Sequence, residues 1–389
     1  MALVPKSIVK DRWLRTLAQM ECGTLVFVGP DGEEITQTGR RPGPTARFVM
    51  YDWSVLQRAA MRGDIGFGED YIAGGWDTDD IESLIAYFLL NFDALGNYAN
   101  GNFLHRLLFV LTNTVVRRNS ESGSRRNIQA HYDVGNDFYA LWLDETMSYS
   151  SALYDPARHT LAEAQHNKYS RILSKLGKED REILEIGCGW GGFAEDAANA
   201  GRNITGVTIS PAQHAFASQR LSKKADIRLE DYRKTAGRFD AVVSIEMFEA
   251  VGERYWPQYF RTVAERLKSG GRAVIQTILI RDDLFGAYRS RSDFLRHYVF
   301  PGGMLPSLAR FREEAATAGF AVVDVFSFGQ DYARTLRDWS ARLRARERDV
   351  LALGRNRQFL RNWEFYFGMC AAAFAVGRTD VAQIELVRT

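Results

Sequence analysis

The stretch ILEIGCGWGGFAEDAA, residues 183–198, decides the fold. A short apolar run leads into Gly187, Gly189, Gly191 and Gly192, and residues with helical spacing follow. Glycine permits a tight turn after a strand, and it lets backbone N–H groups and the start of the helix approach a ligand closely. The stretch therefore predicts a strand, a ligand-binding loop and a helix.

Strand-like and helical stretches alternate along this part of the chain. Apolar runs typical of buried strands recur after the glycines, and stretches with helical spacing lie between them. Such an order is typical of right-handed βαβ units, whose parallel strands bind ligands beyond their carboxyl ends. We therefore predict an α/β fold with a mostly parallel sheet and helices on both faces. The predicted strands are 182–187, 203–209, 240–247 and 272–278, and the predicted helices are 193–200, 212–223 and 255–267.

A polar stretch divides the chain into two parts. The first part contains a strand-like run, 23–28, and a helical stretch, 81–90, but no catalytic constellation. Residues 117–126, RRNSESGSRR, lack hydrophobic periodicity, which is typical of an exposed linker. The predicted organisation is a smaller domain at 1–115, a linker at 116–126 and a larger domain at 127–389.

The composition is that of an ordinary globular protein. Apolar residues make up 46% and charged residues 25% of the 389 residues, which argues against long disorder. Fifty Lys and Arg against 48 Asp and Glu give a net charge of +2, too little for a dedicated nucleic-acid-binding protein. The densest arginine cluster, 334–361, leaves two interpretations open: a solvated helix face, or a contact with an anionic membrane surface.

Neither a disulfide framework nor a metal site is predicted. Cys22, Cys188 and Cys370 lie far apart, without a CxxC pair or a Cys/His cluster, and a reducing cytoplasm fits this pattern. The longest apolar run, 365–377, is shorter than the roughly 20 residues that a membrane-spanning helix needs. We predict a core helix there.

The glycine-rich loop admits more than one ligand. Its spacing is not the G-x-G-x-x-G of dinucleotide-binding proteins, although a variant of that fingerprint remains an alternative, and Glu185 would instead attract a cationic ligand. The pattern E-x-G-x-G-x-G after a first strand resembles the S-adenosylmethionine loop of class I methyltransferases, which have a Rossmann-like sheet. The resemblance implies S-adenosylmethionine as the cofactor, bound by Glu185, Gly187, Gly189 and Gly191.

The second strand lacks the acidic residue with which class I methyltransferases hold the ribose hydroxyls. It ends in GVTISPAQ, 206–213, so hydrogen bonds would have to come from Thr208, Ser210 and Gln213. Further on, Asp231 would accept a hydrogen bond from the adenine amine, and Tyr232 would stack on a ring. A core or rim aromatic is the alternative interpretation of that tyrosine.

Four motifs in order along the chain make the resemblance more specific. Together they resemble cyclopropane-fatty-acyl-phospholipid synthase and the mycolic acid cyclopropane synthases over nearly all of 127–377. The N-terminal domain, with GEDYIAGGWDTDDIESLI, resembles the lipid-associated domain of the bacterial enzymes. The motifs are NIQAHYDVGNDFYALWLDETMSYSSALYD (127–155), SIEMFEAVGERYWPQYF (244–260), YVFPGGMLPS (298–307) and DYARTLRDW (331–339).

The resemblance implies roles for residues by position. Glu249 matches the active-site glutamate of the family, and Tyr332 matches a tyrosine that helps to hold an active-site bicarbonate. The further positions that contact the cofactor are Tyr149, Ser150, Thr208, Ile209, Gln213, Asp231 and Tyr232, with Ile245 and Glu246 close by. Aromatic rings that would stabilise a carbocation at the substrate are Tyr149, Phe294, Tyr298 and Phe300.

The chain departs from the family pattern at three positions. Ser151 stands where the family has a Cys, Ala250 where a His follows the glutamate, and Gln276 where a strand ends in His. Ser151 and Gln276 still offer hydrogen bonds to an anion, but Gln276 cannot titrate near neutral pH as a His can. We therefore predict that the base is moved or replaced, and we note that Glu246 adds a carboxylate.

These features predict S-adenosylmethionine-dependent C-methylation of the double bond of unsaturated phospholipid acyl chains. Loss of a proton from the new methyl group would give a cyclopropane, whereas loss from a neighbouring chain carbon would give a methyl-branched unsaturated chain. The alternatives are a small-molecule methyltransferase and a catalytically silent lipid-binding homologue. The resemblance also implies a cytoplasmic enzyme that is peripheral at the inner face of the membrane, and a homodimer.

Overall fold

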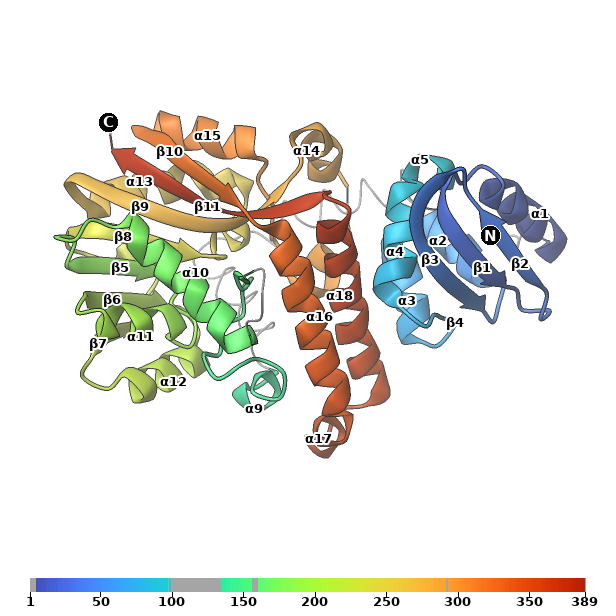
Figure 1. Ribbon diagram of the computed structural model, residues 1–389, viewed down its shortest axis with the longest axis horizontal. Helices are drawn as coiled ribbons and strands as arrows, with labels where there is room; N and C mark the ends of the chain where they lie inside the picture. Colours follow the sequence, from blue (N-terminus) through green and yellow to red (C-terminus); the bar gives the residue numbers. More distant parts are fainter. Residues whose placement is uncertain (1–4, 97, 99–133, 156–159, 292, 389) are drawn as a thin grey trace. The chain divides into compact units, whose positions relative to one another are not determined.

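The chain folds into two compact units that are not continuous in sequence. A computed structural model describes residues 5–96, 98, 134–155, 160–291 and 293–388 (Figure 1). The first unit comprises 1–116, 290–299 and 344–377, and the second unit comprises 117–289, 300–343 and 378–389.

Seven strands form the sheet of the second unit: β5 (Glu182–Ile186), β6 (Asn203–Thr208), β7 (Ala225–Leu229), β8 (Phe239–Ile245), β9 (Leu267–Ile280), β10 (Phe320–Ser327) and β11 (Thr379–Arg388). Their order in the sheet is β10-β11-β9-β8-β5-β6-β7. β5 pairs in parallel with β6 on one side and β8 on the other, while β11 runs antiparallel to β9 and β10. The strand order reverses between β5 and β8, and ligands bind beyond the strand ends at such a switch point.

Helices cover both faces of this sheet, as Figure 1 shows. Ile183 and Leu184 are neighbours on β5 but belong to different hydrophobic clusters, because successive side chains of a strand point to opposite faces. The cluster around Ile183 includes Tyr169 and Phe193, and the cluster around Leu184 includes Phe260. The helices are α9 (Asn136–Tyr139), α10 (Leu161–Lys175), α11 (Gly192–Asn199), α12 (Pro211–Leu221), α13 (Trp256–Arg266), α14 (Asp282–Arg289), α15 (Leu308–Thr317) and most of α16 (Gly329–Ala345), with short 3₁₀ turns η1 (Tyr232–Lys234), η2 (Phe248–Ala250) and η3 (Glu253–Tyr255).

The first unit has a four-stranded sheet with the order β2-β1-β3-β4. Its core is aromatic: Trp13 lies 5.8 Å from Phe27, 6.1 Å from Phe48 and 6.4 Å from Phe88, measured between ring centroids. These edge-to-face contacts join a helix to the sheet. The elements are α1 (Lys6–Leu17), β1 (Cys22–Val28), β2 (Glu34–Thr38), β3 (Arg41–Met50), α2 (Ser54–Arg62), α3 (Asp64–Ile72), β4 (Trp76–Asp77), α4 (Ile81–Leu90), α5 (Phe92–Leu95), the π-helical turn η4 (Leu295–Val299), α17 (Glu347–Ala352) and α18 (Arg357–Ala375).

Two segments from the second half of the sequence pack within the first unit. Phe294 lies against Phe365 of α18, with 4.8 Å between the ring centroids, and both rings meet α3 at Gly68. Residues 290–299 and 344–377 therefore group with the N-terminal part, although we predicted one continuous domain at 127–389. The predicted linker at 116–126 lies outside the described residues, so that boundary stays a prediction.

The predicted α/β class is confirmed by the mostly parallel sheet. The four predicted strands correspond to β5, β6, β8 and β9, and the three predicted helices correspond to α11, α12 and α13. The run at 365–377 lies in a partly buried helix, α18, up to Ala375, where that helix ends. The sequence did not predict β7, β10 and β11. Among the described helices, none combines the length and the apolar character that crossing a bilayer requires.

Replacing Gly68 by Ala should destabilise the protein. The added Cβ would lie 2.6 Å from atoms of both Phe294 and Phe365, so at least one ring must move. We expect a net cost of about 1–3 kcal/mol, seen as a lower melting temperature in calorimetry. The control is Gly286→Ala on α14, where the new Cβ meets no heavy atom within 4 Å and a stability equal to or above wild type is expected. Equal melting temperatures for all three proteins would contradict this packing.

Candidate active site

The glycine-rich loop connects β5 to α11 at the switch point. Gly187, Gly189 and Gly191 have φ angles of +82°, +54° and +87°, which glycine adopts without strain. The backbone N–H of Gly187 donates to the carbonyl oxygen of Val207 at 2.9 Å, which ties the loop to β6. A side chain at Gly187 would lie 2.8 Å from Met247, so this turn has no room for one.

Glu185 is a buried carboxylate just before this loop. Its exposed fraction is 2%, and its Oε2 has no hydrogen-bond partner among the described residues. Burial raises its pKa to about 8, although the charge of Lys168 opposes this shift. An unpartnered buried acceptor fits a ligand that brings a hydrogen-bond donor or a positive charge.

The end of β6 offers neutral hydrogen-bonding groups in place of a carboxylate. Thr208 Oγ1 donates to Gln213 Oε1 at 2.9 Å, and both side chains are buried. Ser210 caps α12, because its Oγ accepts from the Gln213 backbone N–H at 3.3 Å. Ile209 between them is half-buried. These residues are brought together as predicted, and their contact with a cofactor stays a prediction.

Asp231 and Tyr232 follow β7. Asp231 accepts from the side chain of Arg233 at 2.9 and 2.6 Å. Burial alone would raise the pKa of Asp231, but the hydrogen bonds from Arg233 outweigh it and hold the pKa below its ordinary value. The ring of Tyr232 packs edge-on against Tyr259 at 5.7 Å, so it lies at the border of the core.

Glu246 is the central carboxylate of the site. It directly follows β8 and has a φ angle of +49°, a conformation that L residues rarely adopt. Its Oε1 accepts from the Ser151 backbone N–H at 2.8 Å and from Gln276 Nε2 at 2.7 Å, while its Oε2 accepts from the Tyr332 hydroxyl at 2.7 Å. Burial raises its pKa, and these hydrogen bonds together with the charge of Lys168 oppose the shift.

Glu249 lies one 3₁₀ turn further along the chain, on η2. Its Oε1 accepts from Thr277 Oγ1 at 3.0 Å and from the Ile278 backbone N–H, whereas its Oε2 has no partner among the described residues. Burial, followed by the negative charge of Glu246, raises the pKa of Glu249 to about 8. These effects favour the protonated form of Glu249, and its Oε2 can face a ligand.

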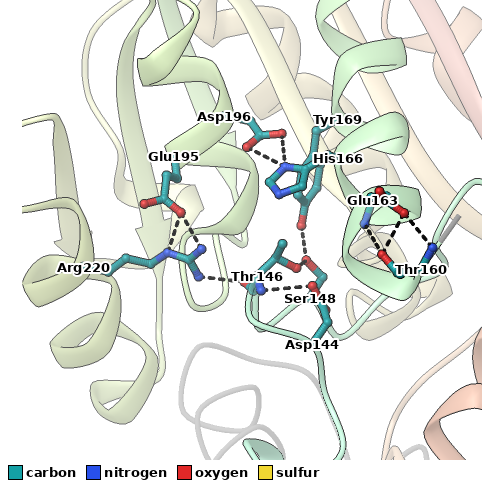
Figure 2. Close-up of polar contacts among 10 residues, drawn as sticks. All are labelled: Asp144, Thr146, Ser148, Thr160, Glu163, His166, Tyr169, Glu195, Asp196 and Arg220. Atoms are coloured by element: carbon teal, nitrogen blue, oxygen red, sulfur yellow. Dashed lines mark hydrogen bonds and ion pairs between the residues drawn. The ribbon is translucent and has the colours of Figure 1, made fainter.

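A hydrogen-bond network fixes the segment that leads into residues 149–151 (Figure 2). Tyr169 on α10 contacts the hydroxyl of Ser148, whose oxygen lies 2.5 Å from Thr146 Oγ1. Arg220 on α12 donates to the Thr146 carbonyl oxygen at 2.8 Å and also pairs with a carboxylate on α11. Three helices thus hold this segment beside the loop.

Aromatic rings surround Tyr149. Its ring centroid lies 5.6 Å from that of Tyr139 and 5.4 Å from those of Trp142 and Trp339, and Tyr332 lies edge-on to Trp339 at 6.1 Å. Such rings attract a cation to their faces and keep water away from it. This part of the second unit therefore suits chemistry that passes through a positive charge.

The predicted site residues do not all meet in one place. Ser151, Gln276 and Tyr332 converge on Glu246, and Ile245 is the last residue of the strand before it. Phe300 is 37% exposed and belongs to the second unit.

Phe294 and Tyr298 belong to the first unit. Phe294 is fully buried against Phe365, while Tyr298 is 46% exposed and donates its hydroxyl hydrogen to Glu69. Phe294 therefore packs as a core residue. The substrate contacts of these two aromatics stay predictions. Within the described part of the chain, no three His, Cys, Asp or Glu side chains are grouped as a metal would require.

Lys168 and Gln383 were not predicted. Lys168 Nζ donates to Ser150 Oγ at 2.6 Å, and Gln383 Nε2 donates to Gln276 Oε1 at 3.1 Å. Both side chains are buried. The local signal for Lys168 was a polar residue on the apolar face of α10, but nothing in the sequence near Gln383 marks it.

The glycine loop at the switch point and the buried acceptor before it define a class I S-adenosylmethionine-dependent methyltransferase. The chain belongs to the mycolic acid cyclopropane synthetase family, whose model matches residues 119–384. It is 36% identical to tuberculostearic acid methyltransferase UfaA1 of Mycobacterium tuberculosis over 98% of this chain and 91% of the relative. It is 32% identical to cyclopropane-fatty-acyl-phospholipid synthase of Escherichia coli K12, over 86% of this chain and 85% of the relative.

A solved structure supports both the fold and the cofactor. Mycolic acid cyclopropane synthase CmaA1 in complex with SAH and CTAB is 30% identical, with a TM-score of 0.64 over 68% of this chain and 98% of that one. SAH is S-adenosylhomocysteine, the product that remains when S-adenosylmethionine has transferred its methyl group. The predicted family and enzyme class are thus confirmed, and so is S-adenosylmethionine as the cofactor.

Replacing Gly187 by Ala should weaken cofactor binding. The new Cβ would meet Met247 at 2.8 Å and strain the φ angle of +82°, so the loop must shift. We expect at least about tenfold weaker binding of S-adenosylhomocysteine in calorimetry, because a shift costing about 1.4 kcal/mol has that effect. Gly201→Ala is the control, since its φ of +79° is equally strained but its Cβ would meet nothing within 4 Å. Equal affinity losses in both variants would contradict this role of the loop.

Proposed function

We propose that this enzyme transfers a methyl group from S-adenosylmethionine to the double bond of an unsaturated phospholipid acyl chain. Family membership and the names of the relatives support a lipid acyl substrate. The ring cluster around Tyr149 and the buried carboxylates support an intermediate with positive charge. A poor nucleophile such as an alkene needs a strongly electrophilic donor and an aligned, dry site.

The chemistry requires a base after methyl transfer. A carbon–carbon bond forms between the alkene and the methyl group while the sulfur–methyl bond breaks, which releases S-adenosylhomocysteine and leaves a carbocation on the chain. A C–H bond must then lose its proton to the base, so that the electron pair of that bond closes a ring or forms a new double bond. The base must be ionised beforehand, and it must lie within reach of the chain.

We propose Glu246 as this base, in the place that bicarbonate would take. The observation that carries the proposal is that Ser151, Gln276 and Tyr332, three positions expected to hold bicarbonate, all donate to the Glu246 carboxylate. A bicarbonate would find these donors already used, and it would be repelled by the carboxylate. The residues therefore do not fit bicarbonate.

Two products are compatible with a base at Glu246, and we propose the methyl-branched unsaturated chain. The choice between ring and branch depends on which proton the base removes. The base is also the point at which this chain departs from the pattern of cyclopropane synthases. In this proposal the carboxylate at the end of β8 takes the proton from a neighbouring chain carbon and not from the new methyl group.

The setting of the reaction is part of the proposal. A phospholipid substrate implies that the enzyme works at a membrane surface, and we propose peripheral association with its inner, cytoplasmic face. The arginine-rich stretch 334–361 supports contact with anionic headgroups, although several of its arginines pair with carboxylates, for example Arg346 with Asp349. A homodimer also remains a prediction.

Glu246→Gln should abolish most of the activity. The amide keeps the size of the side chain but cannot accept the proton, so we expect a loss of about 10²- to 10⁴-fold in product formation. The assay uses vesicles of unsaturated phospholipid with methyl-labelled S-adenosylmethionine, followed by mass spectrometry of the released fatty acids. Mild hydrogenation then distinguishes the product types, because a branched alkene takes up hydrogen whereas a saturated ring-containing chain does not.

Bicarbonate supplies the matched control. Wild-type activity should be unchanged in buffer stripped of bicarbonate, and Glu246→Gly, which opens the space, should recover activity when bicarbonate is added. Loss of wild-type activity on stripping would contradict Glu246 as the base, and a cyclopropane product alone would contradict the branched product. Cofactor turnover without any labelled lipid would point to a small-molecule methyltransferase instead.

A further inference from the structure

Lys168, in the middle of α10, is a buried charge to which the proposed mechanism gives no role. Its side chain has no exposure, and no other lysine in the described part of the chain is buried. Nζ donates to Ser150 Oγ at 2.6 Å and lies 4.5 Å from the centre of the Tyr169 ring. Neither contact is with a carboxylate. An ammonium group held in this way costs free energy that an apolar side chain of similar size would not.

The side chain of Lys168 supports the first donor to Glu246. Lys168 holds the hydroxyl of Ser150, and Gln165, one turn earlier on the same face of α10, donates to the Ser150 carbonyl oxygen at 3.0 Å. Ser150 is thus held by both its side chain and its backbone. The next residue, Ser151, donates its backbone N–H to Glu246 Oε1 at 2.8 Å.

The backbone of Lys168 supports the second donor. Its carbonyl oxygen accepts from Gln383 Nε2 at 3.3 Å, and the same amide donates to Gln276 Oε1 at 3.1 Å. Gln276 in turn donates through Nε2 to Glu246 Oε1 at 2.7 Å. Both donors to this oxygen are therefore connected to one residue of α10.

The charge of Lys168 also acts on Glu246 directly. Burial lowers the pKa of Lys168 to about 8, while Glu246, Asp144, Glu185 and Asp196 raise it. In return, the positive charge lowers the pKa of Glu246 against the effect of burial. Of these acids, Asp196 pairs with a histidine at 2.8 Å (Figure 2), whereas Asp144 and Glu185 each keep one oxygen without a partner among the described residues. The charge of Glu246 also raises the pKa of Glu249, which favours its protonated form.

We propose that Lys168 is a positioning residue: it orients the two donors to Glu246 Oε1 and supplies a buried positive charge that favours the ionised form of this carboxylate. The inference rests on the proposed role of Glu246 as the base. Substituting a residue that only fills space would change the stability of the protein. Substituting a residue that positions Glu246 would also change the pH at which the base becomes active.

Lys168→Met tests the proposal through the pH profile. An ionised base makes kcat/KM rise with pH through its pKa, so loss of the positive charge should move this acidic limb to higher pH, by about one unit. The matched control is Lys175→Met, two turns along the same helix, where the lysine pairs at 2.6 Å with the partly exposed Asp324. In that variant, the acidic limb of the kcat/KM pH profile should stay where it is in wild type.

A second readout does not depend on turnover. The carboxyl band of Glu246, identified by its absence in Glu246→Gln, can be titrated by infrared spectroscopy of protein labelled with ¹³C-glutamate. We expect this group to become protonated at a higher pH in Lys168→Met than in wild type. If the lipid reaction fails while the band shifts, the proposed function is wrong but the electrostatic role of Lys168 stands.

Lys168→Gln covers the case in which the methionine variant does not fold. It keeps a donor for Ser150 without the charge, so it should show the same shift in the band and in the acidic limb. Unchanged titration of Glu246 in the folded variant, with an acidic limb like that of wild type, would overturn the proposal and leave Lys168 as a structural residue.

Discussion

The organisation of the second unit depends on one buried carboxylate. Glu246 loses its hydration at the end of β8, and such a loss is tolerable only if hydrogen-bond donors replace the water. The three donors come from a loop before the glycine turn, from β9 and from α16. Because these elements are distant in sequence, the charge is satisfied only in the folded arrangement that brings β8, β9 and α16 together.

Two neighbouring carboxylates of this site have different environments. Glu246 accepts three hydrogen bonds and feels a nearby ammonium group, which favours its ionised form, whereas Glu249 has one unpartnered oxygen and feels the charge of Glu246. Burial raises the pKa of both groups, but the donors and the ammonium group oppose the rise at Glu246, whereas the charge of Glu246 adds to the rise at Glu249. In the proposed mechanism, this short stretch of chain thus supplies the base and, beside it, a carboxyl group whose protonated form is favoured.

The sequence predicts features that neighbouring residues form, and it misses contacts between residues that are distant in sequence. The glycine turn, its strand and the following helix come from neighbouring residues, and the motif around Glu249 is continuous, so both could be read from the sequence. Glu246 was expected near the cofactor, but its three donors were expected to hold a separate anion. Lys168 and Gln383 could not be predicted, because their partners Ser150 and Gln276 lie in other segments and the contacts exist only once α10 and β11 pack.

In the proposed mechanism a side chain takes the place of a bound anion, which preserves the charge of the site. A bicarbonate and a carboxylate each bring one negative charge and accept hydrogen bonds from the same donors, so one can replace the other without changing what the surrounding residues must neutralise. Both together would place two anions in one buried pocket, which is costly at low dielectric. A neutral Gln276 suits the carboxylate, because its amide donates to Glu246 while its oxygen accepts from Gln383, which fixes its direction. A tethered base also needs no recruitment from solvent, so the proposed mechanism ties the activity to the ionisation of Glu246.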